Sequence, residues 1–375
     1  MGTDTSLKAI AGIFLGCALL IVSPANAQDA SIDRLLNKLP PPEKVAKLNL
    51  QKALQQNDPA ERDPLVKQII KAELTRDFPR ALGYSRTLVE RYPRSAGAQC
   101  VRGSIALALR QYGEASAALR ASIALRPNLV LAHFLLAVME GRQGHYAAAI
   151  SHLERVKEID PKPAVTYYAL SDCMLRTGRK VEGLTYAKRA AELAPSNVFM
   201  WIQLAKAERA LGNREATLDA MTKAAEVAPD SGPIFAVIGY SYINLNRTRD
   251  AVAPLERAAR RMPRDYLVQS QLGYCLEETG QLDAAITYLR KGASLKSSYG
   301  PAWEHLGLAY QKKGAHKDAV KAFERATQLL PQSPRPWMHL ADEYRAIGRT
   351  TDADRAAARA QQLGHLAPKP SVKKT

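Results

Sequence analysis

The chain has 375 residues, which is too long for one ordinary compact core and enough for two domains or one elongated array. Apolar residues make up 46% and charged residues 24%, a composition that excludes a disordered chain. The formal net charge of +17 makes nucleic acid, anionic lipid and acidic polymers electrostatically plausible partners.

The N-terminal segment has the pattern of a secretory signal. Residues 9–23 form an apolar run after Lys8, and the small residues Ala25 and Ala27 complete a cleavage site. The run is shorter than the ~20 residues that a membrane-spanning helix needs. We therefore expect residues 1–27 to be a cleaved signal peptide and the mature protein to be periplasmic or secreted. Export argues against nucleic acid as a partner. An uncleaved anchor is the alternative, and we expect membrane association only in that case.

A linker and a capping helix are expected in residues 28–61. The prolines of the stretch LPPP at 39–42 predict a stiff, extended linker. Residues 43–57 predict a helix that caps the segment that follows.

From residue 62 onward the sequence repeats every 34 residues. A proline closes most units, with Ser297 as the one interruption, at Pro93, Pro127, Pro161, Pro195, Pro229, Pro263 and Pro331. A second ladder marks a turn inside the units, at Gly144, Gly178, Gly212, Gly280, Gly314 and Gly348, with Asn246 in one gap. Glycine and asparagine both tolerate the left-handed conformation that ends a helix. Each unit is therefore predicted to be a helix–turn–helix pair.

The unit from residue 300 carries the fullest pattern, in Trp303, Leu306, Gly307, Tyr310, Ala319, Phe323, Ala326 and Pro331. This pattern resembles the tetratricopeptide repeat, here of an exported bacterial type. The resemblance implies an all-α, right-handed superhelical solenoid of helix–turn–helix repeats. Nine repeats of 34 residues are expected over residues 62–363, starting at 62, 96, 130, 164, 198, 232, 266, 300 and 334. Residues 364–375 are expected to be a disordered basic tail.

The sequence shows no constellation for catalysis. It lacks a glycine-rich phosphate loop and the HExxH, CxxC and GxSxG motifs. His133, His305 and His339 lie in separate repeats, and His133 replaces an aromatic residue of the core stripe. We therefore predict a core role for His133, no enzymatic activity, and neither a metal ion nor a cofactor.

The three cysteines after residue 27 are expected to stay unpaired. Cys173 and Cys275 share a register three repeats apart, and each repeat advances the array. Their Cα atoms should therefore lie beyond the ~7 Å limit for a disulfide. We expect these two and Cys100 to behave as small buried hydrophobic residues.

The first helices of four consecutive repeats, from residue 130 to residue 245, are predicted to be apolar on both faces. First helices line the concave surface in the repeat family, so the resemblance implies a shared groove for a protein or peptide segment of a partner. Packing against neighbouring helices is the alternative explanation. The predicted groove residues are Leu131, Phe134, Val138, Val165, Tyr168, Leu175, Phe199, Ile202, Lys206, Arg209, Tyr240 and Ile243. An interaction scaffold of this kind would serve envelope assembly or secretion.

Basic residues recur in the second helices, at Arg155, Arg189, Lys223, Arg257, Lys291 and Arg325. We expect most of this ladder to be a solvated face. A denser cluster of Arg257, Arg260, Arg261 and Arg264 predicts an anionic contact. Binding of an acidic polysaccharide or lipopolysaccharide through the basic surface is therefore the alternative function.

Overall fold

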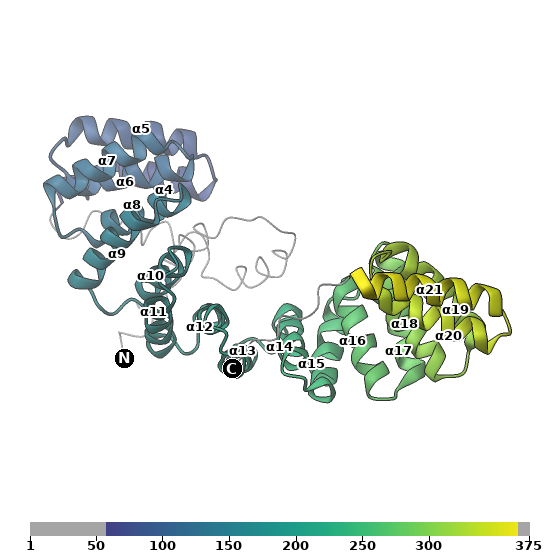
Figure 1. Ribbon diagram of the computed structural model, residues 1–375. Coiled ribbons are helices and arrows are strands. Elements are labelled where there is room, and N and C mark those ends of the chain that lie inside the picture. Colours follow the sequence, from purple (N-terminus) through teal and green to yellow (C-terminus); the bar gives the residue numbers. More distant parts are fainter. Residues whose placement is uncertain (1–57, 367–375) are drawn as a thin grey trace. The chain divides into compact units, whose positions relative to one another are not determined.

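The computed structural model describes residues 58–366, and this part of the chain is helical without any strand (Figure 1). Eighteen helices follow one another there in nine pairs. The expected signal peptide, linker and capping helix, and most of the expected tail, lie outside the described residues. None of the described helices is long and apolar enough to cross a membrane. The chain divides into two compact units between Val227 and Ala228.

The first unit contains five helix pairs. They are α4 (Pro64–Leu74) with α5 (Phe78–Arg91), α6 (Ala96–Ala108) with α7 (Tyr112–Leu125), α8 (Val130–Arg142) with α9 (Tyr146–Ile159), α10 (Ala164–Arg176) with α11 (Lys180–Leu193), and α12 (Val198–Ala210) with α13 (Arg214–Val227). Each helix packs on its partner, and α5, α7, α9 and α11 each pack on the first helix of the next pair. First helices also contact each other, α6 with α8 and α10 with α12.

The second unit contains four pairs built in the same way. They are α14 (Gly232–Asn244) with α15 (Thr248–Arg261), α16 (Tyr266–Glu278) with α17 (Leu282–Leu295), α18 (Gly300–Lys312) with α19 (His316–Leu329), and α20 (Pro334–Ala346) with α21 (Thr350–Leu366). Here α18 contacts both α16 and α20. No two second helices within residues 58–366 make a contact of comparable extent. The first helices therefore form the more closely spaced row in each unit, and each unit curves toward them.

The all-α solenoid of helix pairs that the sequence predicts is confirmed, and its turns share one backbone device. In every described pair the turn holds one residue with a positive φ angle, close to 80° at the glycines of the ladder. Asn246 takes the same conformation with φ 59°, as expected. Arg76 and Arg110 also adopt it, with φ 58° and 59°. The left-handed turn is thus imposed by the helix pair, even where the side chain disfavours it.

Small residues allow the two helices of a pair to approach closely. A Cβ atom at Gly307 would lie only 2.6 Å from the ring of Phe323, so α18 and α19 could not pack as they do with a larger residue there. Ala319, one turn before Phe323 on α19, is fully buried. The alanine and glycine positions of the repeat therefore set the distance between the helices.

A recurring hydrogen bond joins five of the described first helices to the residue of the proline ladder that precedes each of them. The indole Nε1 of Trp201 donates to the carbonyl oxygen of Pro195 at 2.7 Å, and Trp303 donates to Ser297 at 3.0 Å. His133 occupies this register, and its Nε2 lies 2.9 Å from the carbonyl oxygen of Pro127. Because a carbonyl only accepts, Nε2 of the buried His133 must donate this bond. The same bond is made by Tyr167 to Pro161 and by Trp337 to Pro331.

Candidate functional site

Ten of the twelve predicted groove residues lie on α8, α10 and α12 of the first unit. Six of these are buried, namely Leu131, Phe134, Val138, Val165, Tyr168 and Phe199. Leu175, Ile202 and Lys206 are partly exposed, and Arg209 is exposed. Only these four therefore offer surface to a partner in the described conformation. The binding role of the groove stays a prediction.

The surface around Lys206 combines apolar and charged groups. Asp172 on α10 accepts a hydrogen bond of 2.6 Å from Nε of Arg176, one helical turn later. Burial lowers the pKa of Lys206, while the Asp172 carboxylate acts in the opposite direction and Arg176 and Arg209 lower it further. The face thus holds a half-buried amine and an exposed guanidinium beside Leu175 and Ile202, which suits a segment that carries apolar side chains and a carboxylate.

The two other predicted groove residues, Tyr240 and Ile243, lie on α14 of the second unit and are partly exposed. Burial raises the pKa of Tyr240, so its hydroxyl group stays protonated at neutral pH. These two residues belong to a different compact unit from the other ten.

Most residues of the basic ladder are paired on their own helices. Arg155 binds Glu158 at 2.8 Å, and Arg189 binds Glu192 at 3.0 Å. Lys223 binds Glu226 at 3.0 Å, and Arg325 donates to the amide oxygen of Gln328 at 2.9 Å. At the first three of these positions a carboxylate three residues later neutralises the basic side chain. At Arg325 an amide oxygen three residues later accepts a hydrogen bond from it.

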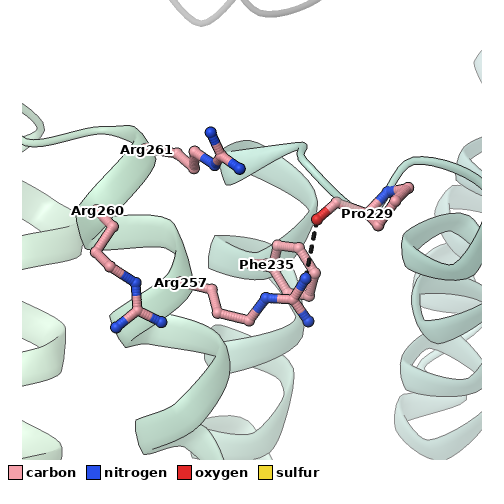
Figure 2. Close-up of a pocket in the computed structure, with 5 residues that line it drawn as sticks. All are labelled: Pro229, Phe235, Arg257, Arg260 and Arg261. Atoms are coloured by element: carbon pink, nitrogen blue, oxygen red, sulfur yellow. Dashed lines mark hydrogen bonds between the residues drawn. The ribbon is translucent and has the colours of Figure 1, made fainter.

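The arginine cluster on α15 surrounds a pocket of about 290 Å³, lined by Pro229, Phe235, Arg257, Arg260 and Arg261 (Figure 2). Phe235 occupies the register of Trp201 and Trp303 but has no hydrogen-bond donor. Arg257 replaces it: Nη2 donates to the carbonyl oxygen of Pro229 at 2.9 Å, and the guanidinium carbon lies 3.8 Å from the centre of the Phe235 ring (Figure 2). The structure therefore fixes Arg257 from two directions.

The structure brings three of the four predicted anion-contact residues together around this pocket. Arg260 is only 4.0 Å from Glu256, at the limit of an ion pair, and its side chain is 67% exposed. Arg261 pairs with Asp230, whose side chain is 75% exposed. Arg264 lies beyond the end of α15 and is absent from the lining. We refer to the five lining residues as the arginine pocket.

The sequence did not mark Phe235 and Pro229 as part of this site. The signal was available, because Phe235 is a position where five other repeats carry tryptophan, tyrosine or histidine with a ring or hydroxyl donor. Where the ring lacks a donor, the basic ladder residue beside it can bond to the carbonyl group that would otherwise have no partner.

The described cysteines are buried within the helix pairs. Cys100, Cys173 and Cys275 are buried free thiols, and burial raises the pKa of each to about 12. Their thiolate forms are therefore scarce at neutral pH. Within residues 58–366, no group of three or more His, Cys, Asp or Glu side chains could hold a metal ion.

Solved structures with a similar fold cover about half of this chain. YrrB, described as a TPR protein with an unusual peptide-binding site, is 19% identical over 49% of this chain and 95% of its own, with a TM-score of 0.46. PilW, a type IV pilus biogenesis factor, is 19% identical over 54% and 94%, with a TM-score of 0.44. MamA from Desulfovibrio magneticus is 17% identical over 46% and 97%, with a TM-score of 0.43.

No curated protein matches the sequence significantly. Two family profiles match it, and both are described as tetratricopeptide repeat. One matches residues 75–129, 100–164 and 237–299, and the other matches residues 300–333. These matches fall on described helix pairs of both units, and the pairs show the left-handed turns and close helix approaches described above. The chain therefore belongs to the tetratricopeptide repeat family.

Proposed function

We propose that this protein is an interaction scaffold without enzymatic activity, which binds a segment of a partner protein along the first helices of its first unit. Tetratricopeptide repeat proteins bind peptide or protein partners. The observation that carries the proposal is the contact between α10 and α12, two first helices that leave Leu175, Ile202, Lys206 and Arg209 accessible. Apolar contacts with a polar rim are typical of segment-binding surfaces.

The charges on this surface define the bound segment. Lys206 and Arg209 are positive, and the buried carboxylate of Asp172 is held by Arg176. A segment with apolar side chains and at least one acidic residue fits this arrangement, because its carboxylate would meet the two basic groups.

Photo-crosslinking from single positions tests the proposal. A photoreactive amino acid at Arg209 or Ile202 should capture one partner protein in the native cell. The matched control is Thr185, which is exposed on the second helix α11. The charge reversal Arg209→Glu should weaken the crosslink from Ile202. Equal capture from Thr185 would contradict the assignment of the first helices as the binding surface.

We further propose that the protein is exported and acts in envelope assembly or secretion. The support is the apolar run with small residues before Gln28. N-terminal sequencing should find Gln28 as the first residue, and thiol titration after unfolding should find three cysteines rather than the four in the full sequence. A lipid on Cys17, or a retained Met1, would show that the segment is not cleaved as proposed.

Binding of an acidic polysaccharide or lipopolysaccharide through the basic surface is the second candidate. The net charge of +17 and the exposed arginines of α15 favour it. Salt separates the two candidates: polyanion binding should collapse between low and moderate ionic strength, whereas apolar contacts on the first helices should persist.

A further inference from the structure

The α14–α15 pair departs from the other pairs at several positions on one small surface. Phe235 replaces a donor-bearing ring, as described above. Arg260 occupies the register of Glu158, Glu192 and Glu226, the residues that neutralise the ladder in other pairs. Arg261 occupies a register that is apolar in most other pairs, for example at Leu193, Val227 and Leu295, although Arg91 holds it in the first pair. The ladder position Arg257 therefore has an arginine three residues later, where Arg155, Arg189 and Lys223 have a carboxylate.

Two contacts hold the guanidinium group of Arg257 in a fixed orientation. The bond from Arg257 to Pro229 supplies what the indole supplies elsewhere, and the Phe235 ring supports the guanidinium from one side. A guanidinium carries several N–H donors in a fixed plane, so one bond to a carbonyl leaves donors for a further acceptor. Because Arg257 is already held in place, a ligand that meets it loses less side-chain entropy on binding.

The rim of the arginine pocket already accepts one carboxylate from the chain itself. Asp230, in the turn before α14, pairs with Arg261 and is mostly exposed. Arg260 adds a second positive charge at the rim and is held only weakly by Glu256. An incoming acid would meet Arg257 and Arg260 directly, and it would compete with Asp230 for Arg261.

We propose that the arginine pocket binds an acidic side chain from a segment of a partner protein. A volume of about 290 Å³ has room for an acidic side chain. The walls formed by Pro229 and Phe235 suit the methylene groups of glutamate, and arginine binds carboxylates bidentately. In the described chain the ladder positions with intrahelical partners do not extend the positive surface as a track for a polysaccharide. This site goes beyond the proposed function, since it uses no residue of the first unit.

The test uses the full-length purified chain and a fluorescein-labelled peptide rich in glutamate and leucine. Fluorescence polarisation should show binding of this peptide and no binding of its glutamine counterpart. Arg260→Glu should lower the affinity about tenfold or more, as expected for loss of a charge-assisted hydrogen bond. This change restores the intrahelical pair that Arg155 makes with Glu158, so it should not impair folding. Asp230→Asn should raise the affinity, because it releases Arg261.

The matched control is Arg290→Glu, an exposed arginine of α17 that changes the net charge equally. It should alter the affinity by less than about twofold. An equal loss in both variants would show that net charge alone attracts the peptide and would overturn the pocket. Failure of the wild-type chain to bind the peptide would overturn it as well.

A second variant removes the pocket without changing charge. Phe235→Trp places an indole where Trp201 and Trp303 already bond to the ladder carbonyl, so the larger ring should fill the space and release Arg257. We expect thermal stability to be kept and peptide affinity to fall about tenfold. Full affinity in this variant would contradict the proposal, and so would loss of binding in Arg209→Glu, which would assign the peptide to the first unit. Stronger binding of polygalacturonate that survives Arg260→Glu would replace the protein segment by a polyanion.

Discussion

The first helices of the two units use one sequence register in opposite ways. Phe134 on α8 is 0% exposed, and Glu304, at the same register on α18, is only 7% exposed. Around Phe134 the side chains from Leu131 to Met139 are buried and, apart from His133, apolar. The repeat therefore tolerates either an apolar or a charged side chain at this position, provided that the charged side chain has hydrogen-bond or ion-pair partners.

Three buried glutamates with basic or amide partners join successive pairs in the second unit. The carboxylate of Glu277 on α16 lies 3.1 Å from Nδ1 of His305 and also forms an ion pair with Lys312. His305 and Lys312 are both on α18. Glu304 pairs with Arg335 of α20 at 2.9 Å. Glu343 accepts a bond of 2.7 Å from Gln311 and lies 2.9 Å from His316. These ion pairs and hydrogen bonds thus connect first helices of the second unit, whereas Phe134 of the first unit contributes apolar burial. The two sites should therefore respond differently to mutation and pH.

The largest effect is expected for Phe134→Ala in the first unit. The substitution leaves a cavity at a fully buried position, and we expect the free energy of unfolding to fall by about 3–5 kcal/mol. Urea denaturation measures this loss. Ile202→Ala, at the partly exposed position of the same face, is the matched control and should cost clearly less. A loss below about 1 kcal/mol for Phe134→Ala would show that the first unit does not depend on this ring.

The second-largest loss in the free energy of unfolding is expected for Glu277→Gln in the second unit. Burial raises the pKa of Glu277, but the hydrogen bonds from His305 and Lys312 outweigh it, so the pKa lies below its ordinary value near 4.5. The pair therefore stabilises the fold above pH 4.5 and loses that contribution as the pH falls. We expect the variant to lose roughly 1–3 kcal/mol at pH 7 and less near pH 3.

The exposed neighbour Glu278 provides the control for this change. Its side chain shares Lys312 at 3.4 Å but is 46% exposed, so Glu278→Gln should leave the free energy of unfolding nearly unchanged. Equal losses at 277 and 278 would mean that burial of Glu277 adds nothing to the ion pair.

A glutamate of the first unit should show the opposite pH dependence. Burial raises the pKa of Glu73 on α4 to about 7. The folded state then favours the protonated acid, so its stability falls as the pH rises from about 4.5 to 7. Because Glu73 is only half-buried, we expect Glu73→Gln to be more stable than the wild type by roughly 1–2 kcal/mol at pH 8 and equal to it near pH 4.5. Thermal melts at both pH values measure the difference, and a less stable variant at pH 8 would contradict it.

The smallest effect concerns a turn of the first unit. Arg110 has the left-handed conformation that glycine supplies in most other pairs. Arg110→Gly should raise the free energy of unfolding by about 0.5–1 kcal/mol, since the relief of steric strain exceeds the entropy that glycine loses. Gly178→Ala, at the equivalent turn with φ 79°, should have the opposite effect in the same melting experiment.

Much of the fold was predictable from the sequence, because each repeat carries particular residue types at the positions where the backbone conformation demands them. Glycine or asparagine marks seven of the described left-handed turns, and those residues adopt that conformation most readily. Arg110 was missed, since nothing in an arginine side chain indicates a positive φ angle. The bond from His133 to Pro127 follows from its register with Trp201 and Trp303.

The candidate site was less predictable, because periodicity indicates on which face of a helix a side chain lies but not how much of that side chain is exposed. Phe134 and Arg209 both belong to the predicted groove, yet the first is fully buried and the second is exposed. That difference depends on how closely neighbouring helices approach each position. The arginine cluster was visible as local charge density, whereas the pocket depended on Phe235, which lacks a donor.

The three buried thiols have a practical consequence for handling this protein. Because Cys100, Cys173 and Cys275 are free, the described helix pairs need no oxidant to form and no reductant to survive. The array should therefore fold equally well when residues 28–375 are produced in a reducing cytosol and when the whole chain is exported. Recombinant material from a reducing cytosol should therefore be a valid sample for measurements on the described helix pairs.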